Sequence, residues 1–353
     1  MKRILSLTLL LGAAILLVNA QSNRKVLFIG NSYIYTNDLP NMIKTLASGC
    51  GDTLEYSQST PGGCTFQNHL SNSTTMGYVN AGGWDHVVLQ EQSQLPSFPY
   101  GQVQSECFPY AEQLCEAIRE SAPQANIVFF MTWGRRDGDA SNCANYPPLC
   151  TYEGMDSLLC ARYTEMAEQN HAALSPVERV WHHLRNEHPE IELYSSDGSH
   201  PSAVGSYAAA VTFYTILFRR SPSCINNDLA VDAAAAQAVR ETVERVVYDS
   251  LDYWYRFVDS TQQVSDKLTR NSNLHVYPNP ANSYIDIEMN LHTTFGACRY
   301  VLYDVAGRSV HETVSTGEAA RMDLSGCAPG VYLLRAVASG QAVATTKVVV
   351  TGK

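Results

Sequence analysis

The stretch Val26-Leu27-Phe28-Ile29-Gly30-Asn31-Ser32 decides the fold class of this chain. Its four consecutive apolar residues show no polar alternation, which is typical of a central strand in a parallel sheet that is covered on both faces. Gly30 and Asn31 then predict a turn that presents Ser32 at the carboxyl end of the strand. Ligands bind at that edge of open parallel sheets, so Ser32 is the first candidate for a nucleophile.

Strands and helices are expected to alternate beyond this stretch. Three more strands are predicted at residues 53–59, 85–89 and 126–133. Helical spacing and capping residues predict helices at residues 37–49, 65–70, 106–121, 156–174, 175–188, 203–218 and within 230–257. Such alternation predicts a parallel sheet with helices on both faces.

A polar loop, Ser195-Ser196-Asp197-Gly198-Ser199-His200-Pro201, precedes the alanine-rich helix at 203–218. Asp197 can accept from one ring nitrogen of His200, which fixes the tautomer and leaves the other nitrogen free to take a proton. Ser32, His200 and Asp197 are therefore expected to form a catalytic triad. The alternatives are that Asp197 only caps the following helix and that Ser32 is an ordinary turn residue.

Two of these blocks resemble the SGNH, or GDSL-type, hydrolase superfamily of esterases. Gly30-Asn31-Ser32 matches its first block, Gly-Asp-Ser, with Asn31 in place of the acid. Asp197 and His200 match its last block, Asp-x-x-His. The glycine of its second block matches Gly62 or Gly63, and Gly63 is preferred.

The third block of the superfamily, Gly-x-Asn-Asp, is absent. Residues 87–93, Val-Val-Leu-Gln-Glu-Gln-Ser, stand in its place and resemble a branch with Leu-Gln-x-x-Ser after this strand. A glutamine there would supply an amide donor. Gln90, at the strand end, is preferred over Gln92.

The resemblance implies a flavodoxin-like three-layer α/β/α SGNH hydrolase fold and a serine esterase that needs no metal or other cofactor. The backbone N–H groups of Ser32 and Gly63 and the Gln90 amide, with Gln92 as the alternative, would bind the oxyanion. The substrate by family analogy is an O-acyl ester, above all an O-acetyl ester of a carbohydrate. The alternatives are a lipase or thioesterase for longer chains and a non-catalytic surface glycan-binding module.

From residue 274 onward, short β-type runs with turn signals predict a small all-β sandwich. Residues 276–281, 302–308, 330–334 and 347–350 resemble the C-terminal sorting domain of the type IX secretion system. The resemblance implies a Bacteroidetes-type source, the secretion machinery as a partner, and a secreted or cell-surface location reached through the periplasm and across the outer membrane. It also implies cleavage of the tail. A carbohydrate-binding sandwich is the alternative.

The amino terminus predicts a secretory signal peptide at residues 1–20, with Lys2 and Arg3 before an apolar run and small residues before Gln21. The expected organisation is completed by a catalytic domain at 21–258, a polar linker at 259–273 and the sorting domain at 274–353. No later segment is apolar for long enough to span a membrane. A net charge of −10 without a Lys/Arg run argues against a nucleic-acid partner.

Ten cysteines in an exported chain predict disulfides. The pair expected in the tail is Cys298–Cys327, and proximity in sequence suggests the pairs Cys50–Cys64 and Cys143–Cys150. The absence of a C-x2-C pair argues against a zinc site.

Two further groups have competing interpretations. His182, His183 and His188 resemble a metal cluster, but on a helix the first two point about 100° apart. Trp133 could stack against a sugar, although such aromatic residues more often belong to the core.

Overall fold

The computed structural model describes residues 21–258, 274–289, 298–304, 308–315, 319–338 and 341–351. The chain divides into two compact units, Met1–Phe257 and Val258–Lys353. The expected signal peptide, residues 1–20, and the expected linker, residues 259–273, lie outside the described residues. No helix among the described residues is both long and apolar enough to cross a membrane.

The first unit is built on a sheet of five parallel strands in the order β2-β1-β3-β4-β5. The strands are β1 (Asn23–Ile29), β2 (Thr53–Ser59), β3 (His86–Leu89), β4 (Asn126–Phe130) and β5 (Ala173–Ser175). This order is the flavodoxin-like arrangement, so the predicted three-layer α/β/α class is confirmed. The helix expected at 156–174 is too long, because its last residues belong to β5.

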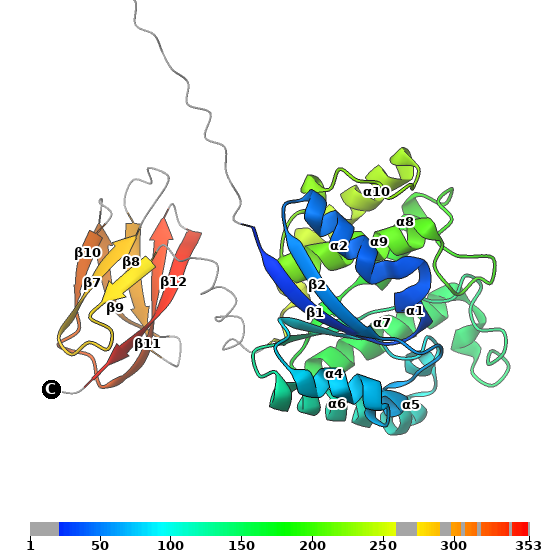
Figure 1. Ribbon diagram of the computed structural model, residues 1–353, viewed down its shortest axis with the longest axis horizontal. Helices are drawn as coiled ribbons and strands as arrows, with labels where there is room; N and C mark the ends of the chain where they lie inside the picture. Colours follow the sequence, from blue (N-terminus) through cyan, green and yellow to red (C-terminus); the bar gives the residue numbers. More distant parts are fainter. Residues whose placement is uncertain are drawn as a thin grey trace, which may run out of the picture. The chain divides into compact units, whose positions relative to one another are not determined.

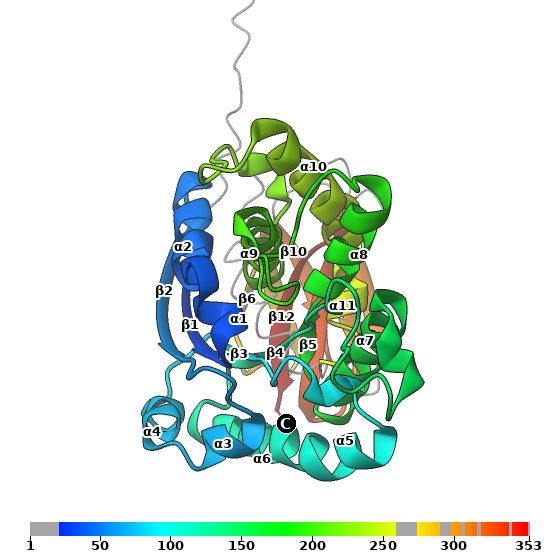
Figure 2. The same ribbon diagram turned by 90° about the vertical axis from the view of Figure 1, so that its right-hand side faces the viewer.

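Helices cover both faces of this sheet (Figures 1 and 2). One face carries α1 (Ser32–Tyr35), α2 (Leu39–Gly49), α8 (Val177–Glu187), α9 (Ala203–Phe218) and α10 (Ala233–Val243). The other carries α3 (Phe66–Leu70), α4 (Ser73–Ala81), α5 (Tyr100–Glu106), α6 (Phe108–Ser121) and α7 (Tyr152–Gln169), and the short α11 (Leu251–Trp254) follows later in the chain. All residues of α9 from Gly205 to Phe218 are buried, as expected of a helix that is apolar on every side.

Three stacked aromatic rings connect the sheet edge with the core. Trp133 lies between Tyr33 and Trp181, with ring centroids 4.7 Å and 3.8 Å away and nearly parallel planes. Trp133 is fully buried. It is therefore a core residue, and the sugar-stacking interpretation is wrong.

The disulfides agree only in part with the expectation from sequence. Cys143–Cys150 is present as predicted. Cys50 pairs with Cys224 instead of Cys64, because α2 packs beside α9 and brings the ends of these two helices together. Cys298 and Cys327 are not joined, and the prediction of that bridge is wrong.

Removing the Cys50–Cys224 bridge is expected to destabilise the first unit substantially. The bridged residues are 174 positions apart, so the bridge restricts the unfolded chain strongly, and a double Cys→Ser variant should lose about 2–5 kcal/mol of unfolding free energy. Urea denaturation measures this loss. The matched control is the double Cys→Ser variant of Cys143 and Cys150, which are only 7 positions apart and should contribute about half as much. A larger loss in that control would contradict the prediction.

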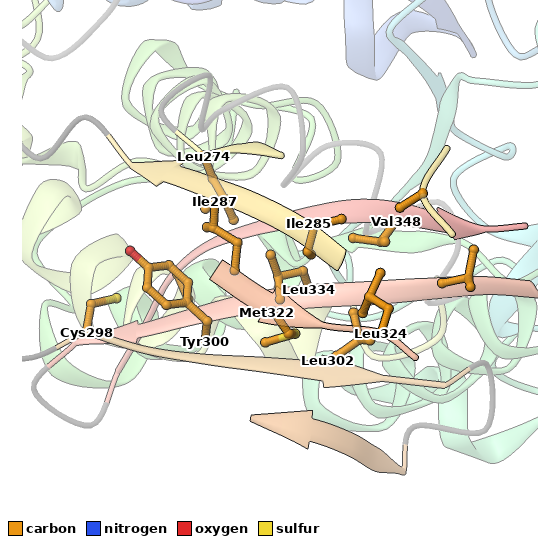
Figure 3. Packing of buried hydrophobic residues seen from close by; sticks show 13 residues of the cluster. Leu274, Ile285, Ile287, Cys298, Tyr300, Leu302, Met322, Leu324, Leu334 and Val348 are labelled. Carbon is orange, nitrogen blue, oxygen red and sulfur yellow. The ribbon is translucent and has the colours of Figure 1, made fainter. Parts of the chain in front are cut away.

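The second unit consists of two antiparallel sheets with strand orders β10-β7-β6 and β12-β11-β8-β9. The strands are β6 (Leu274–Tyr277), β7 (Tyr284–Met289), β8 (Cys298–Tyr303), β9 (Ser309–Ser315), β10 (Ala319–Asp323), β11 (Gly330–Ala338) and β12 (Gln341–Val350). Alternate residues of both sheets, such as Ile285, Ile287, Tyr300 and Leu302, form a common core (Figure 3). The predicted all-β unit is therefore confirmed.

Candidate catalytic site

The candidate nucleophile lies where β1 ends. Ser32 is the first residue of α1 and is partly exposed, and Asn31 caps this short helix by accepting from the Tyr33 N–H. The Asn31 amide also donates to the carbonyls of Cys64 (3.1 Å) and Glu91 (3.4 Å). Asn31 therefore connects the loops that follow β1, β2 and β3. A carboxylate, which only accepts, could not make these two bonds.

The structure brings Ser32, His200 and Asp197 together in one hydrogen-bonded chain. The Oγ of Ser32 lies 2.9 Å from Nε2 of His200, and Nδ1 of His200 lies 2.5 Å from Oδ2 of Asp197. When Nδ1–H donates to the carboxylate, Nε2 is left to accept the serine proton. The cap of α9 is Ser202, whose Oγ accepts from the Gly205 N–H, so Asp197 is not needed for that role.

Hydrogen bonds keep the carboxylate of Asp197 charged. Burial by itself would raise the pKa of Asp197, but the bonds from the His200 ring and from the N–H groups of Ser199 (2.9 Å) and His200 (3.0 Å) outweigh it and lower that pKa. The Asp197 side chain is 49% exposed and the His200 side chain 37% exposed. The pair therefore lies at a surface that substrate can reach.

The loop that carries Asp197 and His200 is fixed from several sides. The indole Nε1 of Trp133 donates to the Ser199 carbonyl (3.1 Å), and the Tyr33 hydroxyl lies 2.8 Å from the Ser199 Oγ. Arg136 donates from its guanidinium to the Ser195 carbonyl (3.0 Å) and from its backbone to the Gly198 carbonyl (2.9 Å). These contacts fix the position of His200, which lies in a loop between α8 and α9.

Gly63 lies beside the nucleophile in the turn after β2. Its φ of +66° is in the left-handed region that favours glycine, and its N–H has no backbone partner among the described residues. Gly63 and Ser32 line the same cavity. The two residues whose backbone amides are expected in the oxyanion hole thus line one cavity.

Gln90 does not reach this cavity. Its N–H still bonds to the Ile29 carbonyl (2.9 Å), so Gln90 continues the sheet ladder and its side chain is completely buried. Its Oε1 accepts from the Asn31 N–H (2.9 Å), and its Nε2 donates to the Glu91 carbonyl. Our preference for Gln90 over Gln92 is therefore corrected: Gln92 lines the cavity, and Gln90 supports the nucleophile turn from behind.

Sequence reasoning missed the role of Glu91. Its buried carboxylate accepts from the N–H groups of Phe66 (3.0 Å) and Gln92 (2.7 Å), so it joins the loop after β2 to the loop after β3. Burial raises the pKa of Glu91 to about 8, against the lowering effect of these two N–H groups. A charged residue placed between two amides directly after a buried strand is the signal that would have revealed it.

The cavity next to Ser32 has a volume of about 230 Å³. Its lining is polar and includes one arginine, Arg135, that sequence reasoning also missed. The lining residues are Asn31, Ser32, Tyr33, Gly63, Gln92, Ser93, Arg135, Ser199 and His200.

The histidines considered as a metal cluster pair with different carboxylates. His182 contacts Asp156 (3.3 Å), His183 contacts Glu187, and His188 contacts Glu190. Asp156, Glu178 and His182 do approach one another closely. Arg179 forms an ion pair with Asp156 and with Glu178, so the charge of both carboxylates is already balanced by this cation.

Several solved structures are similar to part of this chain. The structure of a DUF4886 family protein from Bacteroides uniformis is similar with a TM-score of 0.56 and 17% identity, covering 68% of this chain and 99% of that one. A protein described as a candidate SGNH hydrolase from Slackia heliotrinireducens has a TM-score of 0.45 and 25% identity over 54% of this chain and 97% of that one. An acetyl xylan esterase has a TM-score of 0.40 and 15% identity, over 54% and 98%. No curated protein matches the chain.

The second unit has a family match of its own. Residues 275–351 match the secretion system C-terminal sorting domain. A domain of this kind directs type IX secretion to the cell surface or the extracellular space. The chain therefore ends in a secretion system C-terminal sorting domain, attached to an α/β unit whose structural neighbours are SGNH/GDSL hydrolases and a DUF4886 family protein.

Proposed function

We propose that residues 21–258 form an exported serine esterase and that residues 274–353 engage the type IX secretion machinery. The observation that carries the proposal is the hydrogen-bonded chain from Asp197 through His200 to Ser32, which opens into a cavity with Gly63. A nucleophile, a base and a group that orients the base are the three parts of nucleophilic acyl transfer.

In the proposed mechanism, the Ser32 Oγ attacks the ester carbonyl while Nε2 of His200 takes its proton. Asp197 stabilises the imidazolium that forms. The N–H groups of Ser32 and Gly63 bind the oxyanion, and the alcohol leaves with the proton from His200. A water molecule, deprotonated by His200, then cleaves the acyl-enzyme to the free acid.

Gln92 supports the site as the candidate for a third oxyanion donor. Its Oε1 accepts from the N–H groups of Gln94 (2.8 Å) and Leu95 (3.1 Å), which fixes the amide plane. Its Nε2 donates to Gln94 Oε1 (3.2 Å) and keeps a second hydrogen for a ligand.

The size of the cavity favours a short acyl group. Ligand pockets commonly measure about 300–1,000 Å³, and the 230 Å³ next to Ser32 falls below that range. A second hollow of about 300 Å³ shares Gln92 with it. Its other lining residues are Thr65, Gln67, Gln94, Leu95, Phe98 and one acid, Glu106. Polar groups next to an apolar surface suit a sugar, so an O-acetyl ester of a carbohydrate is the substrate class that we propose.

Hydrolysis of p-nitrophenyl esters from acetate to dodecanoate tests this proposal. We expect kcat/KM to be highest for acetate and to fall by at least about tenfold by octanoate, because the cavity has no room for the longer chain. A maximum at long chains would instead support a lipase or thioesterase. Rates at background for the whole series, equal in a Ser32→Ala variant, would support a non-catalytic glycan-binding module.

A further inference from the structure

Arg135 is the one permanently charged side chain among the described residues that line the cavity next to Ser32. It follows the buried Gly134, and its side chain is 25% exposed. The other lining groups are hydroxyls, amides, a glycine and the His200 ring, and none is a carboxylate. An anion in this cavity would therefore meet a cation and no acid.

The guanidinium of Arg135 is held in position by the carboxylate of Asp139. Its Nη1 lies 3.3 Å from Oδ1 of Asp139, whose side chain is completely buried. Asp139 also accepts from the side-chain amides of Gln94 (2.6 Å) and Asn142 (2.7 Å). Burial would raise the pKa of Asp139, but these bonds and the Arg135 charge lower it, so the anchor is a fixed anion.

This anchor leaves part of the guanidinium available. Arg135 has five N–H donors, and the one described side-chain acceptor that they meet is Asp139. Its Nε is buried and has no partner among the described residues, and Nη1 is the atom of the guanidinium that bonds to Asp139. Because Nη1 is held by Asp139 and Nε is buried, Nη2 is the nitrogen that can donate to a ligand in the cavity, and a carboxylate is an acceptor that suits it.

The segment after β3 connects this arginine to the rest of the site. Gln90 supports the nucleophile turn, Glu91 holds the turn after β2, and Gln92 bonds to Gln94. Gln94 in turn holds Asp139, the anchor of Arg135. The same segment therefore holds both the catalytic groups and the anchor of Arg135, which fixes the cation in position relative to Ser32.

We infer that Arg135 binds a carboxylate on the alcohol part of the substrate, so that the enzyme acts on O-acetyl esters of acidic sugars such as uronic acid residues. This inference rests on the proposed esterase function. The chain has a net charge of −10, which repels anionic substrates in general, so a local cation at the reacting ester would decide their binding.

Two aromatic acetates that differ only in charge test the inference: 4-acetoxybenzoate and its methyl ester. We expect Arg135→Gln to lower kcat/KM for the carboxylate on the order of 10- to 100-fold, mainly through KM, because a charge-assisted hydrogen bond is lost. The methyl ester should change less than about threefold. Arg135→Lys should fall between wild type and Arg135→Gln on the carboxylate.

Arg245→Gln is the matched control, since Arg245 pairs with Glu187 on the surface and its loss changes the net charge equally. Equal losses on both esters in Arg135→Gln would overturn the inference, because they indicate a role in the transition state or in folding.

If Arg135→Gln fails to fold, the salt dependence of the wild type provides the test. The rate of hydrolysis of each ester is then compared at about 50 mM and about 500 mM NaCl. Salt should then slow hydrolysis of the carboxylate alone, and an equal effect on both esters would overturn the inference. Absence of any Ser32-dependent hydrolysis would refute the esterase function itself.

Discussion

Ser32→Ala is expected to lower kcat for p-nitrophenyl acetate by about 10⁴- to 10⁶-fold, because alanine has no atom that can form the acyl-enzyme. The Oγ of Ser32 is the group of the Asp197–His200 chain that faces the cavity as a nucleophile. KM should change little, since the hydroxyl contributes mainly to the reaction and not to binding. Steady-state kinetics measures both constants.

Ser105→Ala is the control for this loss. Ser105 is an exposed serine of α5 whose hydroxyl bonds to carbonyls of its own helix, so its variant should retain full activity. A fluorophosphonate should add its mass to the wild type and to Ser105→Ala but not to Ser32→Ala. Unchanged turnover in Ser32→Ala would exclude Ser32 as the nucleophile.

Asp197→Asn is expected to lower kcat by about 10³- to 10⁴-fold with little change in stability. The oxygen of the introduced amide would keep the bonds from the Ser199 and His200 N–H groups, while its nitrogen would donate to Nδ1 of the histidine. The ring would then carry its proton on Nε2 and could not accept the one from Ser32. Asp197 is half exposed, so solvent screens its charge, but screening does not repair the tautomer.

Asp137→Asn is the matched control, because Asp137 is an exposed acid in the loop after β4 and its replacement removes the same charge. It should retain nearly full kcat. A loss of less than about tenfold in Asp197→Asn, with equal melting temperatures, would contradict the assigned role of Asp197 and point to another orienting group.

The positions where strands end could be predicted from the sequence. A continuous apolar run followed by Gly30 and Asn31 predicts the end of β1, and the turn at Gly63 predicts the end of β2. Parallel strands bring their carboxyl ends to one edge, so Ser32 and Gly63 were expected to meet. This part of the site depends on local pattern and on a general rule of topology.

The glutamine that faces the cavity could not be predicted. Side chains alternate between the two faces of a strand. Whether the Gln90 side chain faces the cavity therefore depends on whether the strand pairing ends before or after Gln90. The bond from its N–H to the Ile29 carbonyl extends the ladder, and this bond depends on how the two strands align. Arg135 was missed because its position depends on tertiary contacts. It pairs with Asp139, which Gln94 and Asn142 hold in place by hydrogen bonds.

The Cys50–Cys224 bridge was missed because it depends on the packing of helices. The two cysteines follow α2 and α9, which are distant in sequence and adjacent in space. Proximity along the chain found only the short Cys143–Cys150 bridge. Pairings between helix ends become visible only once the layers of the fold are known.

The stack of Tyr33, Trp133 and Trp181 also gives the protein an optical property. Two of its four tryptophans lie in this stack, and Tyr33 directly follows the candidate nucleophile. Closely stacked, immobile rings are chromophores that couple to one another. We therefore expect these rings to contribute to the near-ultraviolet circular dichroism from a position next to the cavity, where the signal would report on the order of the site without any added label.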